Sequence, residues 1–158
     1  MIEPPRIRIP RRPAQGGGTK TIDLLVDDGP FQTKQKAMMF AAALGYQVER
    51  RGSFASADEP IRWAIFERAG DDLFLSALAV AETDGLEILN GTGDEDYQVV
   101  FEEYANGGLA ELEERVLDEP ADVLDQLIRL LTATRRKEQV GPQGLEGLSS
   151  DQLDAIGL

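Results

Sequence analysis

The sequence predicts an all-α protein, a compact bundle of about five to six helices with flexible N- and C-terminal tails. Three observations lead to this prediction. The stretch Gly29–Tyr46 contains a turn, a helix start and then a helix that is apolar on nearly every side, as expected at the centre of a bundle. Residues 94–117 and 118–131 both repeat apolar side chains at helical spacing. Strand-like alternation is limited to four residues, Arg6-Ile7-Arg8-Ile9.

Composition divides the 158 residues into three parts. Residues 1–18 form a basic arm rich in proline, arginine and glycine, residues 19–134 a helical domain, and residues 135–158 a Gly/Pro-rich linker and short C-terminal tail. Proline and consecutive glycines favour a flexible arm. The alternation over residues 6–9 leaves a short strand as the alternative, with both arginines on one face. Near the C-terminus, Ser149 and Ser150 precede either a frayed end or a partner-docking peptide.

Turn and capping residues place the helices of the domain. A short helix over residues 19–28 ends at a Gly-Pro pair, and the central helix then starts at an N-cap, Thr33, and breaks at Gly45. An exposed loop follows over residues 47–60, and the apolar segment 61–66 is predicted to be helical because helices flank it. A further helix covers residues 71–81. Its expected core positions are Leu73, Phe74, Ala77, Leu78 and Ala81.

Two amphipathic helices complete the bundle. The first spans residues 94–117 and contains Gly107-Gly108, which either breaks the helix or lets another backbone pack closely against it, since two adjacent glycines cost a helix roughly 2 kcal/mol relative to alanine. The second starts at Asp118-Glu119-Pro120. Its predicted buried stripe consists of Val123, Leu124, Leu127, Ile128 and Leu131.

The composition excludes several kinds of chemistry. The chain has no cysteine and no histidine, so zinc sites of the Cys/His type, cysteine nucleophiles and Ser-His-Asp triads are impossible. Carboxylates remain, but we expect them to form a solvated helix face; they are Glu102, Glu103, Glu111, Glu113 and Glu114. We therefore expect no catalytic residues, no cofactor and no metal. The absence of a long apolar span predicts no membrane association and a cytoplasmic protein.

Charge is distributed unevenly along the chain. The net charge is −13, but residues 1–20 hold five basic and one acidic side chain (+4), which leaves −17 for the remainder. An acidic body repels a phosphate backbone, whereas a basic arm attracts nucleic acid or an acidic partner. Lys34 and Lys36 are expected to form a local positive patch with Arg50 and Arg51. The candidate nucleic-acid or partner contacts are Arg6, Arg8, Arg11, Arg12, Lys34, Lys36, Arg50, Arg51 and Arg62.

Several sequence blocks carry a family resemblance. They are Phe31-Gln-Thr-Lys34 with Met39-Phe-Ala-Ala-Ala-Leu-Gly-Tyr46, Ile61-Arg-Trp-Ala-Ile-Phe66, Leu78-Ala-Val-Ala-Glu82, Ile88-Leu89, and Phe101-Glu-Glu-Tyr-Ala-Asn-Gly-Gly-Leu109. Together they resemble the bacterial family called DNA phosphorothioation-associated protein 4, also described as a Dnd system-associated protein. The resemblance covers about residues 20–132, and its most distinctive block is the one that contains the two adjacent glycines.

The resemblance implies a helical accessory protein of a defence system that places sulfur in the DNA backbone. It supplies no catalytic residues. With the missing catalytic set and the acidic body, it favours a non-catalytic adaptor that binds other proteins of a phosphorothioation-linked defence complex. The alternative is a DNA-binding or modification-sensing module that contacts phosphates through the basic arm. A hydrolase that uses carboxylates alone is the weakest hypothesis.

Overall fold

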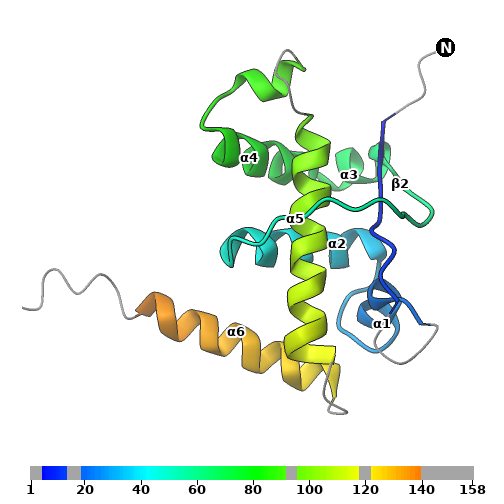
Figure 1. Ribbon diagram of the computed structural model, residues 1–158, viewed down its shortest axis with the longest axis vertical. Coiled ribbons are helices and arrows are strands. Elements are labelled where there is room, and N and C mark those ends of the chain that lie inside the picture. The colour runs from blue at the N-terminus through cyan, green and yellow to red at the C-terminus, as the bar shows by residue number, and fades with distance from the viewer. Residues whose placement is uncertain (1–4, 14–18, 92–95, 118–121, 140–158) are drawn as a thin grey trace, which may run out of the picture.

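The helices are arranged around one long helix, α5, as predicted for an all-α bundle (Figure 1). The computed structural model describes residues 5–13, 19–91, 96–117 and 122–139. In chain order the elements are β1 (Arg6–Ile7), α1 (Thr21–Asp27), α2 (Lys34–Gln47), β2 (Ile61–Arg62), α3 (Trp63–Ala69), α4 (Asp72–Thr83), the 3₁₀ turn η1 (Glu87–Asn90), α5 (Tyr97–Leu112), the π-helical turn η2 (Glu113–Leu117) and α6 (Val123–Gln139).

The centre of the bundle is the crossing of α2 and α5. Thr33 caps α2 as expected, because its hydroxyl accepts a hydrogen bond from the Lys36 backbone N–H. Gly45 does not end the helix, which continues to Gln47. Gly45 instead permits close packing: a Cβ atom there would overlap the Tyr104 carbonyl oxygen on α5. Gly107 and Gly108 likewise leave no space for a side chain, so of the two expected roles for this pair, close backbone packing is the observed one.

The N-terminal segment is part of the domain, which corrects the prediction of a flexible arm for residues 5–13. β1 pairs antiparallel with β2, so the short-strand alternative is the one observed. The side chains of Ile7 and Ile9 are 0% and 1% exposed, and burying two isoleucines offsets the entropy of ordering the segment. The Asp58 N–H donates to the Ile9 carbonyl and extends the contact. Residues 1–4 and 14–18, and the predicted tail over residues 140–158, lie outside the described residues.

The segment that follows the loop differs in two details from the prediction. Residues 61–62 form β2, and α3 starts only at Trp63. On α4 the buried residues are Leu75, Leu78 and Ala79, whereas Leu73 is 73% exposed. Two other predicted core positions, Ala77 and Ala81, are also exposed. The expectation was wrong because α4 packs mainly on α5, with smaller contacts to η1 and α3, and this packing does not bury every apolar position of the helix.

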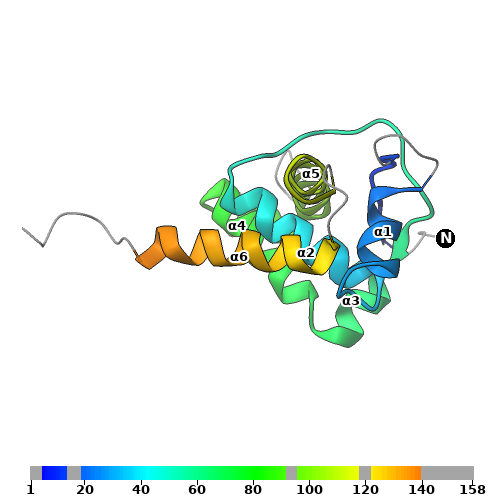
Figure 2. The same ribbon diagram turned by 90° about the horizontal axis from the view of Figure 1, so that it is seen from below.

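The last helix buries far less than its periodicity predicts. α6 extends sideways from the lower end of α5 (Figures 1 and 2), and its end at Gln139 lies beyond the predicted domain boundary at residue 134. Of the predicted buried stripe only Leu127 is buried. The exposed members, Leu124, Ile128 and Leu131, are 43%, 51% and 52% accessible. Helical spacing identified an apolar face correctly, but no other element of the described structure covers all of it.

Candidate functional site

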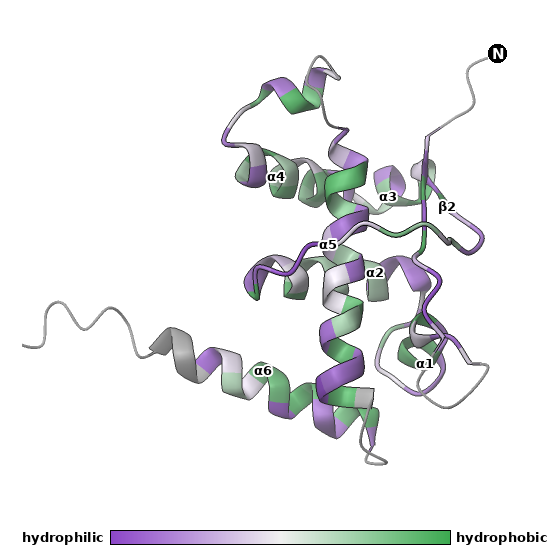
Figure 3. Ribbon diagram, in the orientation of Figure 1, coloured by the Kyte–Doolittle hydropathy of each residue, from purple (hydrophilic) through white to green (hydrophobic). Residues whose placement is uncertain are grey.

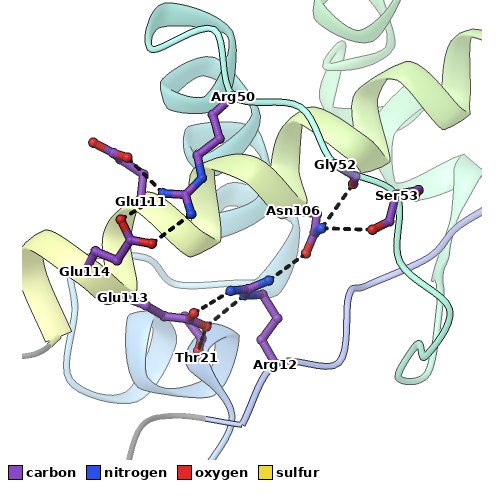
Figure 4. Close-up of polar contacts among 9 residues, drawn as sticks. All are labelled: Arg12, Thr21, Arg50, Gly52, Ser53, Asn106, Glu111, Glu113 and Glu114. Carbon is purple, nitrogen blue, oxygen red and sulfur yellow. Dashed lines mark hydrogen bonds and ion pairs between the residues drawn. The ribbon is translucent and has the colours of Figure 1, made fainter.

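Arginines from distant parts of the chain pair with carboxylates along α5 and η2 (Figure 4). The Arg12 guanidinium donates to both Glu113 oxygens at 2.9 and 2.6 Å and to the Asn106 side-chain oxygen at 3.2 Å. The Asn106 amide in turn donates to the Gly52 carbonyl oxygen at 3.0 Å, and the Thr21 hydroxyl donates to Glu113 at 2.5 Å. This network connects the N-terminal segment, α1 and the 47–60 loop to one side of α5.

Three of the five glutamates that were expected on a solvated face are not solvated, which corrects that expectation, whereas Glu114 is exposed as expected. Glu102, Glu111 and Glu113 are buried. The Arg8 backbone N–H and side-chain Nε donate to the two Glu102 oxygens, both at 2.7 Å. Burial raises the pKa of Glu102, and the contacts from Arg8 only partly offset this effect. A buried carboxylate retains its charge only with such partners, so these pairs hold the bundle together.

The loop arginines also face carboxylates. Arg50 contacts Glu111 at 3.1 Å and Glu114 at 2.8 Å, and the hydrogen bond to Glu114 raises the pKa of this guanidinium. Arg51 donates to Glu103 at 2.8 Å and to Glu82 at 3.0 Å. These pairs connect the start of the loop to α4 and α5.

The expected positive patch of lysines and loop arginines does not form. Lys34 and Lys36 lie at the start of α2, whereas Arg50 and Arg51 follow its end, roughly 20 Å away along a helix of this length. Lys34 pairs with Asp23 at 3.2 Å and Lys36 with Asp71 at 2.7 Å. Likewise, Arg11 pairs with Asp58 at 2.8 Å.

Two of the nine candidate contact residues, Arg6 and Arg62, lie on the two paired strands. Arg6 and Arg62 lie directly opposite each other across the β1–β2 pair, and both are exposed. With Pro5, Trp63 and Ala64 they line a surface hollow of about 330 Å³. The structure therefore brings together two of the predicted contacts that are far apart in the sequence.

A polar hollow on another face joins α2, α4 and α5. Tyr46, Glu82 and Tyr104 line part of it, and the Tyr104 hydroxyl donates to Glu82 at 2.5 Å. Burial and this hydrogen bond raise the pKa of Tyr104 to about 12. The same hydrogen bond, helped by Arg51, lowers the pKa of Glu82 against the effect of burial. Tyr104 therefore stays a hydrogen-bond donor at neutral pH rather than acting as a base.

An apolar groove lies between α2 and α6. It encloses about 200 Å³ and is lined by Phe40, Ala43, Leu44, Gln47, Leu130, Leu131 and Thr134. We define the exposed α6 stripe as Leu124, Ile128 and Leu131, of which Leu131 also lines the groove. Figure 3 shows hydrophobic segments recurring along α6. The sequence pattern predicted these three residues to be part of the core. Their spacing of four and then three residues is also that of a seam between packed helices.

The described part of the chain contains no group of three or more acidic side chains placed to hold a metal ion. Within the same residues, no helix is both long and apolar enough to cross a membrane.

Comparison with protein families gives one match over most of the chain. The model of the family described as DNA sulphur modification system-associated protein 4 matches residues 6–148. The chain belongs to this family. The resemblance found in the sequence is thereby confirmed, and it extends further at both ends than the blocks indicated.

The match of this DNA sulphur modification system-associated protein starts at the first residue of β1 and continues past the end of α6. Both the strand pair and the projecting helix therefore lie inside the family region. Neither the comparison with curated proteins nor the one with solved structures gave a match. The family description associates the chain with a DNA sulphur modification system, so other proteins of such a system are plausible partners.

Proposed function

We propose that this protein is a non-catalytic accessory subunit that binds another protein of a phosphorothioation-linked defence system through α6. The observation that carries the proposal is the α6 stripe. Leu124, Ile128 and Leu131 are each about half exposed and follow one another along a single helix edge. Contiguous exposed apolar surface of this kind marks interaction sites in proteins.

The groove beside α6 fits a helical partner. The apolar groove is bounded by two helices, and a third helix laid along α6 would cover the stripe and cap the groove at once. Recognition of this kind uses apolar residues at i, i+3 or i+4, and i+7 of the incoming helix. The partner segment is thus expected to be an amphipathic helix.

Charge favours an acidic partner helix over a second copy of this chain. The stripe is followed one turn later by Arg135 at the same edge of α6, and the sequence continues with two more basic residues, Arg136 and Lys137. An acidic side chain on the partner would meet this end of the helix. A second copy would bring a whole chain with the same net charge of −13, which opposes self-association.

The ion pairs along α5 support the non-catalytic part of the proposal. A catalytic carboxylate needs access to a substrate and a pKa suited to proton transfer. Glu102 and Glu113 are instead buried and held by arginines, a placement that suits a rigid scaffold. Turnover of DNA or nucleotide by the purified protein, lost on changing one of these carboxylates, would contradict this part.

The binding proposal is tested with charge introduced on the stripe. The tagged chain is co-expressed in turn with each protein encoded in the DNA sulphur modification system, and complexes are identified by co-elution in size-exclusion chromatography. An Ile128→Asp, Leu131→Asp double variant should lose the complex, because two carboxylates would be desolvated against the partner.

The matched control is Leu73→Asp on α4. Leu73 is the more exposed residue, at 73%, and lies outside the groove, so this variant should still form the complex. Equal binding by all variants would show that α6 is not the docking surface. Binding to none of the system's proteins would refute the adaptor function. A homodimer dissolved by the double variant would identify a second copy as the occupant.

The alternative function, a DNA-binding or modification-sensing module with a free basic arm, receives less support. Arg8, Arg11 and Arg12 are held by carboxylates of the same chain, and each would have to break an ion pair to contact a phosphate.

A further inference from the structure

The apolar groove between α2 and α6 has an open side along the edge of α6. Leu131, which lines the groove, is 52% exposed, and Ile128 on the same edge is 51% exposed. Removing apolar surface from water stabilises a contact in proportion to the area covered, so even a short helix laid along this edge would be held there. Whether the groove stays open in the free protein therefore depends on which apolar segments of the same chain can reach it.

The sequence that follows α6 contains a helix-start signature of its own. Ser149 is followed three residues later by Gln152, which is the pattern of a capping box. Leu148 and Leu153 then occupy the two positions of a hydrophobic staple. Ile156 follows Leu153 at a spacing of three, so both side chains would lie on one edge of the helix. A short amphipathic helix is predicted here, and because an isolated helix of this length is marginal in water, it needs a surface on which to form.

The charges of α6 and of the following sequence are opposite. Residues 129–139 hold four basic and one acidic side chain, which gives +3. Residues 140–158 hold three acidic side chains and no basic one, which gives −3. An acidic amphipathic helix is the ligand expected for the docking surface on α6, and this chain carries such a sequence itself.

The connection is long enough to bring this sequence back to the groove. Leu131 lies eight residues before the end of α6 at Gln139, roughly 12 Å along the helix axis. Residues 140–147 span up to about 28 Å when extended. The pair Gly141-Pro142 favours a turn directly after the helix. A tether of this length gives an effective concentration of about 1 mM, so a contact with an intrinsic Kd of about 0.1 mM would be formed most of the time.

We propose that residues 148–158, which we call the tail segment, dock as a short helix on the apolar groove and cover the α6 stripe in the free protein. Leu153 and Ile156 supply the apolar contacts, and the acidic side chains face the basic end of α6. A partner helix must displace the tail segment, which is thus an autoinhibitory competitor within the same chain. This regulatory role rests on the proposed docking function, whereas the intrachain contact itself does not.

The contact is measured with a pair of introduced cysteines, because the chain has none of its own. Ala43 is exposed and lines the groove, and Ala155 precedes Ile156 in the tail segment. The full-length Ala43→Cys, Ala155→Cys protein is equilibrated in a glutathione buffer, and mass spectrometry measures the intramolecular disulfide. Adding Leu153→Asp, Ile156→Asp should lower the effective molarity of the cysteine pair about tenfold, since the tail segment would no longer be held on the groove.

The matched control is Gln143→Asp, Ser150→Asp in the same cysteine pair. It adds the same two negative charges but keeps every apolar side chain of the tail segment, so the disulfide should form as before. An unchanged effective molarity in Leu153→Asp, Ile156→Asp would overturn the contact, because a segment that moves at random forms the disulfide equally well in both proteins. A disulfide that joins two chains instead of closing within one would assign the groove to a second copy and overturn it too.

The regulatory role is measured with the partner identified by co-elution. Full-length Leu153→Asp, Ile156→Asp without the cysteines should bind this partner about tenfold more tightly than the wild type, because the competitor is removed. Gln143→Asp, Ser150→Asp should bind within twofold of the wild type. Equal affinity of all three proteins would refute the competition while leaving the docking surface in place. Absence of any partner would refute the docking function and this regulatory role together, whereas the disulfide still decides the intrachain contact.

Discussion

Gly108 on α5 lies directly against the Ala41 carbonyl on α2, so closely that a Cβ atom at position 108 would overlap the oxygen. Gly45 on α2 has the same relationship to Tyr104 on α5. The two backbones therefore touch where the helices cross. An adjacent pair of glycines in a helix, unfavourable by propensity alone, is explained by this contact.

Gly108→Ala is expected to destabilise the protein by several kcal/mol, although alanine is the better helix former by about 1 kcal/mol. The new methyl group must push α2 away from α5 and leave voids in the core. Urea unfolding followed by circular dichroism measures the change. Ala43→Gly at an exposed position of α2 is the comparison and should cost only about 1 kcal/mol. An increase in stability for Gly108→Ala would contradict the observed packing.

Removing the Arg12 side chain should destabilise the fold by about 2 kcal/mol, because Glu113 would remain as a buried carboxylate without its main partner. Arg12→Lys should recover only part of the loss, since an ammonium group cannot donate to both Glu113 oxygens in the fork geometry. Arg68→Ala, with the same loss of charge on an exposed helix, is the reference and should change stability by less than about 0.5 kcal/mol. Equal stability of Arg12→Ala and the reference would favour the flexible-arm prediction.

The contact between the N-terminal segment and the loop should weaken in acid. Burial opposes ionisation of Asp58, but hydrogen bonds from Lys20 and Arg11 outweigh it and hold the pKa of this carboxyl below its ordinary value. The folded state thus binds the Asp58 proton less tightly than the unfolded chain. Its contribution to stability is present above the ordinary pKa and is lost as the pH falls through the lowered one.

The free energy of unfolding, measured by urea titration, should therefore fall more steeply with acidification in the wild type than in Asp58→Asn. The amide has no such titration and retains a similar shape. If the free energy of unfolding of Asp58→Asn falls as steeply as that of the wild type below the ordinary pKa of the carboxyl, Asp58 is not the group responsible.

Glu82→Gln should lower the pKa of Tyr104 from about 12, because the carboxylate that accepts its hydrogen bond and opposes tyrosinate formation would be neutral. Ultraviolet absorbance of tyrosinate follows the titration. Tyr104→Phe assigns the transition, since it removes the Tyr104 hydroxyl and with it the step that belongs to this residue. An unchanged titration in Glu82→Gln would show that burial alone sets this pKa.

Local patterns predicted most helices, but they predicted burial less well. The Thr33 cap was interpreted correctly because it depends on a contact within one helix. The helix over residues 97–112 was predicted too, but it is buried almost all round rather than amphipathic. Leu73 and Ile128 also occur at core-like spacing, yet both are exposed. Periodicity shows that a helix has an apolar face; whether another element covers that face depends on how the chain is arranged in space.

Ion pairs between charged residues were predicted even less well than burial. Arg8 meets Glu102 across 94 positions of sequence, a contact that no spacing rule indicates. Composition alone therefore suggested a basic arm and a solvated acidic face, whereas in the fold Arg12 of that arm pairs with Glu113 as Arg8 does with Glu102.

The sequence by itself determined the helical class, the exclusion of cysteine and histidine chemistry, and the family, because composition, helical period and motif order are properties of the chain read in one dimension. Only the tertiary structure decided which charges are paired, why two glycines lie within α5, and which apolar edge of α6 stays uncovered. Those outcomes depend on segments that are distant in the sequence and meet in the fold. The closest of these contacts is the crossing of α2 and α5, where the two backbones touch.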